Sequence, residues 1–305
     1  MPRNFDFVSF PEKVNNNYLN NIKNRYGKYS GAISLQIKTV DDLYTGSGFI
    51  DYDPKNGLTT STDMEEGKAI IPGSSVKGAL RHVARAVSDG CIISSEASRD
   101  LKLSHQQEKG KCKLADGKSS DKDAVCIICD MFGMMGLASK LIVSDFGSVE
   151  CKLVKRNVPT QFTPSINSPY YKDGTGKHKG YKFYYTNCDP TDGSKYDVIY
   201  AVAKGTQFTG EIRFNGLDEN ELCLLMYCLG FEDKDGGRRL SHKLGGYRAV
   251  GFGTVNFTCQ RFLLNEEEIP IGKAADYAHK YTEICSDDCY ARIDTLEKIM
   301  EYRDK

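Results

Sequence analysis

The alternation of apolar and polar side chains predicts a strand over residues 29–39. There Ile33, Leu35 and Ile37 alternate with small or polar neighbours, which is the period of two of a half-buried strand. Further runs of strand-forming residues follow at 141–146, at 196–214 and, after a glycine-rich turn, within 244–262.

A helical period predicts a helix that begins near residue 72. Apolar residues recur every three or four positions from Val76 to Val87, and Ser74 and Ser75 are natural N-caps. Three more helices are predicted at 220–231, 273–285 and 289–302.

Three segments between these elements lack such periodicity. They are an acidic, glycine-bearing loop at 41–69, a polar, cysteine-bearing insertion at 89–130, and a segment rich in tyrosine, lysine and glycine at 155–187, which we interpret as an extended β-hairpin. The order strand, helix, strands, helix, strand suits an α+β fold with a ferredoxin-like core. We therefore expect one domain over 1–265 that carries these insertions, followed by a C-terminal helical extension over 266–305.

Composition points to a cytoplasmic protein with local rather than global basic character. Lysine plus arginine and aspartate plus glutamate both number 41, yet basic residues dominate 152–182 and 234–261. A neutral protein can bind phosphates along such a stripe. No run approaches the roughly 20 apolar residues of a membrane span, and the first residues lack the apolar core of a signal peptide. Eleven cysteines in a cytosolic chain favour reduced thiols and a metal site.

The segment PGSSVKGALR at 72–81 is a candidate anion site. A helix N-terminus presents unpaired N–H groups, and Gly73 would let a phosphate approach the backbone. Lys77 and Arg81 extend the positive charge along the helix. An ordinary capped helix with a solvated basic face is the alternative.

The segment KLGGYRAVGFGTV at 243–255 concentrates glycines and cations. It leads into a strand and not into a helix, which excludes the dinucleotide-binding context. Glycines permit close approach of an RNA strand, whereas a tight turn with a bulge is the alternative. The candidate RNA contacts here are His242, Lys243, Gly245, Gly246, Arg248, Gly251 and Gly253.

Tyrosines and lysines interleave through the predicted hairpin at 155–187. Aromatic rings stack on nucleobases while lysines offset phosphate charge, although tyrosines are also good strand formers. The candidate RNA contacts are Lys172, Lys179, Lys182 and Tyr184.

A zinc site is predicted at Cys126-Ile-Ile-Cys129, which has the spacing of a metal knuckle. Cys112 and His105 lie upstream as partners, with Cys91 in reserve. The polar region around these residues buries little core and would need such a staple. A pair of buried thiols is the alternative.

Three aspartates in the acidic loop are candidates for catalysis. A carboxylate beside an RNA backbone can hold Mg²⁺ and help to activate an attacking 2′-hydroxyl, whereas a solvated acidic loop explains the same residues without chemistry. The candidates are Asp51, Asp53 and Asp63.

Taken together, these motifs resemble the RAMP superfamily of CRISPR-associated proteins, as found in backbone subunits of type III-like effector complexes. PGSSVKGALR matches the superfamily's PGSS-x-KG-x-x-R helix start, and LGGYRAVGFGTV resembles its glycine-rich loop. Weaker matches lie between them in family order: CIICDMFG at 126–133, LIVSDF at 141–146 and GYKFYYTN at 180–187.

The resemblance implies an RNA-recognition-like core whose copies line up along a guide RNA. The hairpin at 155–187 would be a thumb that kinks the guide and target strands. Carried over to this chain, the guide backbone would be contacted by Gly73, Ser74, Ser75, Lys77, Arg81 and the loop from Gly245 to Gly253, and Cys126 and Cys129 would bind structural zinc with an upstream His or Cys.

We therefore expect a guide-RNA-binding backbone subunit of an antiviral CRISPR ribonucleoprotein complex. Its partners would be guide RNA, complementary target RNA and other effector subunits, including adjacent RAMP subunits. An alternative is that the subunit also cuts target RNA: Asp51 in GFIDYDP best resembles a Gly-x-Ile-Asp signature, while Asp63 lies nearer the PGSS helix. A guide-processing endonuclease and a zinc-bearing interaction protein without an RNA role are further alternatives.

Overall fold

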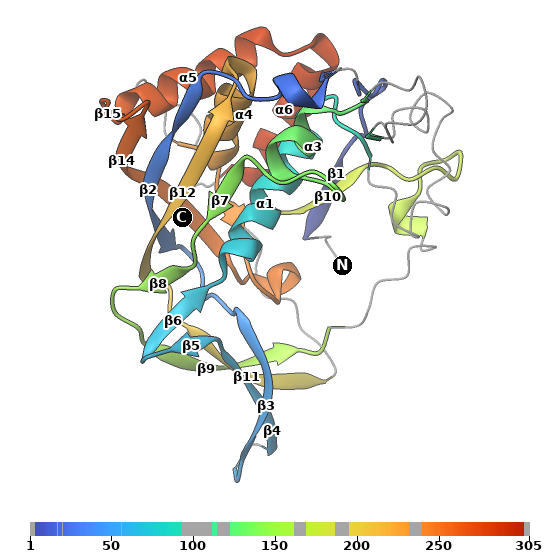
Figure 1. Ribbon diagram of the computed structural model, residues 1–305. Coiled ribbons are helices and arrows are strands. Elements are labelled where there is room, and N and C mark those ends of the chain that lie inside the picture. The colour runs from blue at the N-terminus through green and yellow to red at the C-terminus, as the bar shows by residue number, and fades with distance from the viewer. Residues whose placement is uncertain are drawn as a thin grey trace.

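The protein combines helices with a curled antiparallel sheet (Figure 1), which agrees with the mixture of helices and strands that the sequence predicts. The structure, a computed structural model, describes residues 4–16, 18–19, 21–55, 57–92, 112–114, 123–161, 169–186, 195–231 and 240–301.

The main sheet contains nine strands, each antiparallel to its neighbours. They are β2 (Tyr29–Thr39), β5 (Met64–Glu65), β6 (Lys68–Ile71), β7 (Leu141–Val143), β8 (Phe146–Ser148), β12 (Gln207–Leu217), β13 (His242–Lys243), β14 (Thr254–Leu264) and β15 (Glu267–Glu268). Their order is β13-β14-β2-β12-β8-β6-β5, with β15 beside β14 and β7 beside β12. The strand predicted at 29–39 is therefore confirmed and lies centrally.

Two strand–helix–strand units interlock in this sheet. The chain runs from β2 through α1 (Gly73–Ala86) to β7, and from β12 through α4 (Glu219–Leu229) to β14. Because β2 and β12 are neighbours, the resulting order is β14-β2-β12-β7. The alternating residues Ile33, Leu35 and Ile37 are at most 1% exposed and share one core with both helices.

Helix α4 is apolar on nearly every side because it is enclosed by neighbours. All residues from Glu221 to Leu229 are buried, between the main sheet and α5 (Gly272–Ile284). Asp218 and Glu221 form a capping box at its start, which satisfies two otherwise unpaired backbone donors. Helix α6 (Asp287–Met300) follows, so both predicted C-terminal helices are confirmed to within two residues. None of the helices among the described residues is long and apolar enough to cross a bilayer.

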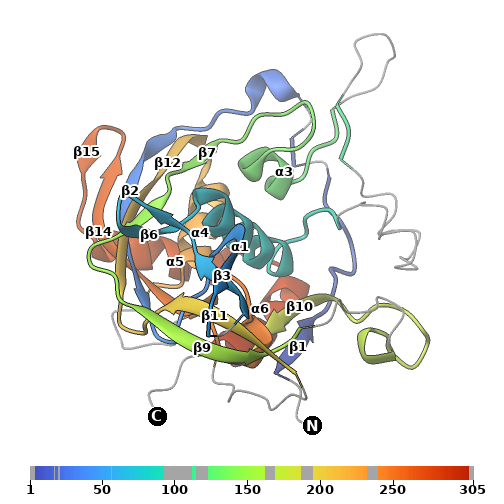
Figure 2. The same ribbon diagram turned by 90° about the horizontal axis from the view of Figure 1, so that it is seen from below.

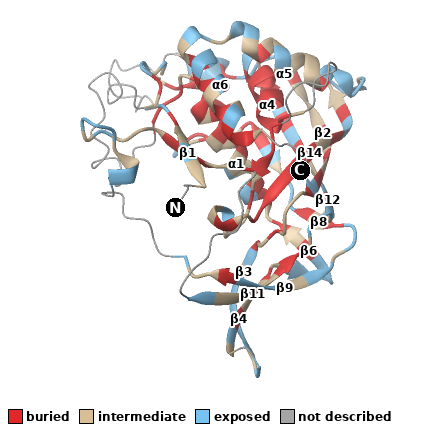
Figure 3. Cartoon of the chain, turned by 180° about the vertical axis from the view of Figure 1, so that it is seen from behind, coloured by how far each residue is buried: buried red, intermediate tan, exposed pale blue. Residues whose placement is uncertain are grey.

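A second, smaller sheet corrects two expectations. It consists of β3 (Gly46–Asp53), β4 (Gly57–Thr62), β11 (Tyr196–Val202) and β9 (Leu153–Pro159), in the order β3-β4-β11-β9. Residues 41–69, expected to form a loop, instead supply four strands. The hairpin β3–β4 projects from the molecule (Figures 1 and 3), and most residues of β3 are exposed to solvent.

The segment 155–187 is not a single hairpin. Its first strand, β9, pairs with β11. Its last strand, β10 (Tyr181–Tyr184), pairs with the N-terminal β1 (Phe5–Val8). Figure 2 shows this β1–β10 ribbon beside α6, apart from the main sheet. The expectation failed because strand propensity identifies strands but not their partners. The remaining short elements are η1 (Ile22–Asn24), α3 (Ile127–Phe132), η3 (Pro169–Tyr171) and η4 (Arg248–Val250).

Four buried charges join α3 to the core. Asp130 accepts from the Arg25 guanidinium at 2.9 Å and contacts the Lys140 ammonium at 2.6 Å. Lys140 also contacts Glu221 at 2.7 Å. Each side chain is at most 6% exposed, so opposite charges must compensate one another there.

Candidate functional site

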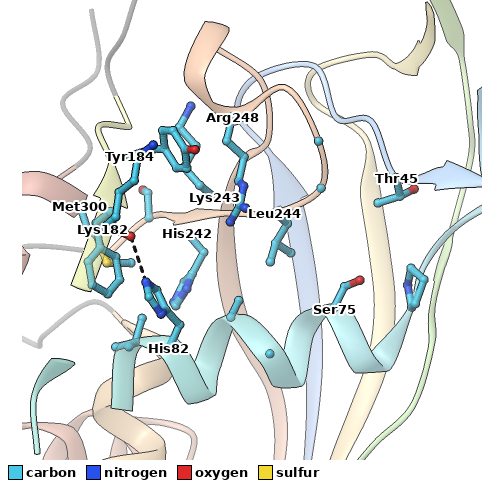
Figure 4. A pocket seen from close by; sticks show the side chains of 18 of the residues that line it. Thr45, Ser75, His82, Lys182, Tyr184, His242, Lys243, Leu244, Arg248 and Met300 are labelled. Carbon is cyan, nitrogen blue, oxygen red and sulfur yellow. Dashed lines mark hydrogen bonds between the residues drawn. The ribbon is translucent and has the colours of Figure 1, made fainter. Parts of the chain in front are cut away.

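A pocket of about 620 Å³ lies where α1, β10 and the loop after β13 meet. Figure 4 shows side chains from these three elements converging on it. Its lining brings together residues more than 200 positions apart: Thr45, Gly46, Pro72, Ser75, Gly78, Ala79, His82, Val83, Lys182, Phe183, Tyr184, Ser241, His242, Lys243, Leu244, Gly245, Gly246, Arg248 and Met300.

Helix α1 contributes a face of small side chains to the pocket. Ser75, Gly78, Ala79 and His82 recur at three- and four-residue steps, so they share one side of the helix. A Cβ atom built on Gly78 would meet nothing within 4 Å. The helix backbone is therefore open to a ligand from this side.

The start of α1 differs from the expected anion site. The amide N–H of Gly73 donates to Asp145 Oδ1 at 2.6 Å, and a Cβ there would lie 2.3 Å from the carbonyl oxygen of Val143. A carboxylate of the same chain thus occupies the position that a phosphate was expected to take. Ser74 is exposed but does not line the pocket.

The basic stripe of α1 points elsewhere. Lys77 Nζ donates to the Leu141 carbonyl at 2.9 Å, and Arg81 donates to the Gly133 carbonyl at 2.9 Å. Burial, together with the nearby Arg81 charge, lowers the pKa of Lys77. These two cations hold α1 against neighbouring segments and do not line the pocket.

The loop after β13 forms the second wall of the pocket. Three of its glycines are required by the conformation of the loop itself. Gly245 and Gly253 have φ angles of +74° and +82°, and a Cβ at either would lie 2.2 Å or less from a carbonyl oxygen. Gly251 also has a positive φ. A tight turn, the alternative that the sequence left open, therefore accounts for these three glycines. Gly246 lines the pocket.

The cations that line the pocket are Lys182, Lys243 and Arg248. The Arg248 guanidinium lies 5.2 Å from the centre of the Tyr184 ring. Lys243 is anchored by the Phe252 carbonyl at 3.1 Å and by Asp41 at 3.4 Å. The pocket is cationic because it is lined by these three cations and, among the described residues, by no carboxylate.

Lys172 and Lys179 lie outside the pocket. The backbone of Lys172 pairs with that of His178 in an isolated antiparallel β-bridge. Lys179 lies 5.9 Å from the centre of the Phe7 ring. Of the four candidates in 155–187, the structure therefore brings only Lys182 and Tyr184 to this site.

Both pocket histidines are neutral at physiological pH. The His82 ring donates from Nε2 to the Lys182 carbonyl at 3.0 Å, a bond drawn in Figure 4, and burial lowers its pKa. His242 is 1% exposed, and burial lowers its pKa to about 4. The positive charge of the pocket therefore comes from lysine and arginine.

The three candidate catalytic aspartates do not come together. Asp51 and Asp53 lie on the projecting β3, where Asp53 Oδ2 accepts from the Tyr200 hydroxyl at 3.0 Å. Asp63 lies at the base of the hairpin, and its amide donates to the Thr45 carbonyl at 2.6 Å. Among the described residues, only a group of cysteines gathers closely enough to hold a metal ion.

That group consists of Cys91, Cys112, Cys126 and Cys129, whose sulfur atoms all lie within 4.8 Å of one another. All four are free thiols. A tetrahedral site with zinc–sulfur bonds of about 2.3 Å needs sulfurs about 3.8 Å apart, and the Cys91 and Cys129 sulfurs lie 3.5 Å apart. The group fits a metal ion bound by four thiolates.

Backbone amides support the sulfurs, as expected around thiolates. The Cys126 amide donates to Cys112 Sγ at 3.1 Å, and the Cys91 amide donates to Cys126 Sγ at 3.4 Å. Hydrogen bonding from Cys112 lowers the pKa of the Cys126 thiol. Cys91, the reserve partner, supplies the fourth sulfur. His105, the other upstream candidate, lies outside the described residues.

Comparison with known protein families identifies the superfamily to which the chain belongs. A family model described as the RAMP superfamily matches residues 36–256, so the chain belongs to this superfamily. No curated protein matches the chain. RAMP proteins function with RNA and with other CRISPR-associated subunits. The match begins within β2 and ends within β14, and so excludes β1, α5 and α6.

Sequence reasoning missed part of the pocket for identifiable reasons. The small residues Gly78 and Ala79 were detectable, because they follow Ser75 at helical spacing. Thr45 and Met300 carry no local signal, since only the folded chain brings them to the pocket.

Proposed function

We propose that the protein is a guide-RNA-binding backbone subunit of a type III-like CRISPR effector complex. The observation that carries the proposal is the convergence of two superfamily motifs and a third basic segment on one cationic pocket. The PGSS helix, the glycine-rich loop and β10 are distant in sequence, yet all three line it.

In this proposal the RNA backbone lies against the small face of α1. Ser75, Gly78 and Ala79 leave room for the ribose–phosphate chain, because none has a side chain that would fill the pocket. Lys182, Lys243 and Arg248 offset phosphate charge from the opposite side, which is the main source of affinity for nucleic acids.

The strand order supports a ferredoxin-like core. In that fold, two interlocked strand–helix–strand units give an antiparallel sheet of order 4-1-3-2, with both helices on one face. The order β14-β2-β12-β7, with α1 and α4 as the crossover helices, has the same arrangement.

We assign the role of the thumb to the hairpin β3–β4 instead of to the segment 155–187. It exposes four large apolar side chains within ten residues: Phe49, Ile50, Tyr52 and Leu58, each at least 68% exposed. Tyr52 and Leu58 face each other across the strands. Apolar side chains on a projecting arm can insert between bases and unstack them, which would kink the paired guide and target strands.

The cysteine group is proposed to hold structural Zn²⁺. Four thiolates form the closed tetrahedral set typical of structural zinc. The four cysteines would join the end of the α1 segment, residues 112–114 and α3, and so hold the insertion at 89–130 against the core.

Cleavage of target RNA remains a second candidate function, and one observation favours Asp63 over the other aspartates. Asp63 adjoins the pocket wall, because its backbone amide donates a hydrogen bond to the carbonyl of Thr45, which lines the pocket. Asp51 and Asp53 instead lie on the projecting strand. An Mg²⁺ ion held there would lower the pKa of the attacking hydroxyl. Loss of cleavage in Asp63→Asn, with cleavage retained in Asp51→Asn and RNA binding retained in both, would support this function.

Sequencing the RNA that co-purifies with the tagged chain tests the main proposal. With neighbouring genes co-expressed, we expect short RNAs of repeat-plus-spacer origin. Arg248→Gln should weaken their retention and lower the slope of log K against log salt by about 0.7, the contribution of one phosphate contact in single-stranded nucleic acid. Arg213→Gln, at an arginine whose side chain is 72% exposed on β12, is the matched control. A preparation free of RNA would refute the proposal.

A further inference from the structure

The β1–β10 ribbon has two unlike faces. Val8, Tyr181 and Phe183 are at most 8% exposed, and Phe183 packs on His82 of α1 with ring centres 4.4 Å apart. This face anchors the ribbon beside the pocket. The register pairs Phe5 with Tyr184 and Phe7 with Lys182, so these four residues share the other face.

That second face is an aromatic surface built around one ammonium group. Lys182 Nζ lies 3.9 Å from the ring centre of Phe5, 4.6 Å from that of Tyr184 and 5.3 Å from that of Tyr171. It also donates to the Tyr171 hydroxyl at 3.0 Å. We call Phe5, Phe7, Tyr171, Lys182 and Tyr184 the aromatic platform. All five side chains are partly exposed.

The charges at the platform are not neutralised by carboxylates. Lys179 lies 5.9 Å from the Phe7 ring centre, and Arg248 lies 5.2 Å from that of Tyr184. Within the described part of the chain, Lys179, Lys182 and Arg248 form no ion pair. The surface therefore brings partly exposed aromatic rings and positive charge without an ion-pair partner together, the combination that binds single-stranded nucleic acid.

The platform is continuous with the pocket, because Lys182 and Tyr184 belong to both, and Arg248, which also lines the pocket, lies over the Tyr184 ring. A strand of RNA whose backbone lies along α1 can therefore reach the platform without leaving the protein surface. The rings of Phe5 and Phe7 come from β1, which lies outside the residues matched by the superfamily. This part of the surface is thus a feature of the chain beyond the shared core.

We propose that the aromatic platform stacks unpaired nucleobases of the RNA strand that leaves the pocket. The proposal rests on the function proposed above and assigns to β1 a role in holding single-stranded RNA. Stacking requires bases, whereas the cationic pocket requires only phosphates, so the two contributions are separable.

Binding to a short oligouridine and to an abasic ribose–phosphate strand of equal length separates them. The double variant Phe5→Leu/Phe7→Leu keeps apolar side chains on β1 but removes two ring faces. We expect it to bind oligouridine about 5-fold to 150-fold more weakly per lost stack and the abasic strand as well as the natural chain does. Tyr290→Leu, at an exposed tyrosine of α6, is the matched control and should leave both affinities unchanged.

Photocrosslinking places the bases directly. An oligouridine carrying 5-iodouridine should crosslink at Phe5 or Phe7 in the tryptic peptide Asn4–Lys13. Crosslinks confined to the pocket peptide Leu244–Arg248, or unchanged oligouridine binding by the double variant, would overturn the platform but leave the proposed function standing. Loss of a neighbouring protein subunit from the double variant, with RNA binding intact, would likewise assign the platform to a protein partner. If the natural chain bound neither strand, the proposed function would fail as well.

Discussion

Gly78 allows the pocket to be blocked without weakening the fold. It lies in the middle of α1, is exposed toward the pocket, and has no atom within 4 Å of the place a Cβ would take. Glycine in a helix interior costs about 0.8–1.0 kcal/mol relative to alanine, and glutamate is close to alanine on this scale. The variant Gly78→Glu should therefore melt at the same temperature as the natural chain or a few degrees higher.

The same change should strongly reduce RNA binding. Its carboxylate enters a pocket where we place phosphates, and two negative charges about 6 Å apart repel by about 3 kcal/mol at an effective dielectric constant of 20. That energy corresponds to roughly a 100-fold loss of affinity. Gly78→Ala, which adds only a methyl group, should bind RNA far better than Gly78→Glu while gaining comparable stability.

Thermal melting and filter binding of labelled guide RNA at fixed salt measure the two effects side by side. Ala291→Glu adds the same side chain at an exposed position of α6 and controls for net charge. A Gly78→Glu protein that melts normally and still binds RNA as tightly as Ala291→Glu would refute the assignment of the pocket to RNA. A lower melting temperature would instead refute our description of Gly78 as facing open space.

Three further predictions concern the zinc content and the stability of the protein. Cys126→Ser should reduce bound zinc, measured by elemental analysis, from about one ion per chain to near none, whereas Cys259→Ser, at a buried thiol outside the cluster, should leave the zinc content unchanged. Asp130→Asn should lower the free energy of unfolding, measured in urea, by about 3–5 kcal/mol, because it leaves buried cations without their counter-charge. As a control, Asp294→Asn removes an exposed ion pair with Lys298 and should lower it by at most about 0.5 kcal/mol. His242 has a folded pKa of about 4 against about 6.5 when unfolded, so the unfolded chain binds more protons in this window. Stability should therefore fall by on the order of 3 kcal/mol as the pH drops from 6.5 to 4, and His242→Gln should flatten that part of the profile.

Elements with a strong local period were predictable from sequence. The strand at 29–39, the helix after Pro72 and the C-terminal helices all bury one face against the same core, so apolar residues recur in each with the period of that element. The segment 41–69 shows no such period. Its strand β3 is exposed along nearly its whole length, and it is held by β4, which pairs in turn with β11 about 140 residues later.

The zinc site was partly predictable for a similar reason. Cys126 and Cys129 stand at a fixed spacing that a metal knuckle requires, so sequence alone identifies them. The choice of Cys91 depends on where α1 ends, and α1 ends beside α3 only because the two helices pack together. Spacing fixes local ligands, and tertiary packing selects the distant one.

The glycine-rich loop shows how a motif can identify a binding site through architecture. Its glycines at 245, 251 and 253 have positive φ angles, so their first task is to fold the loop. Val250 and Phe252 then pack with Ile199 of the second sheet, which fixes the loop between the two sheets. Because the loop is held in this way, Lys243 and Arg248 are presented at a defined distance from α1. The second sheet, whose strand pairing the sequence patterns did not predict, therefore positions the cations of the pocket.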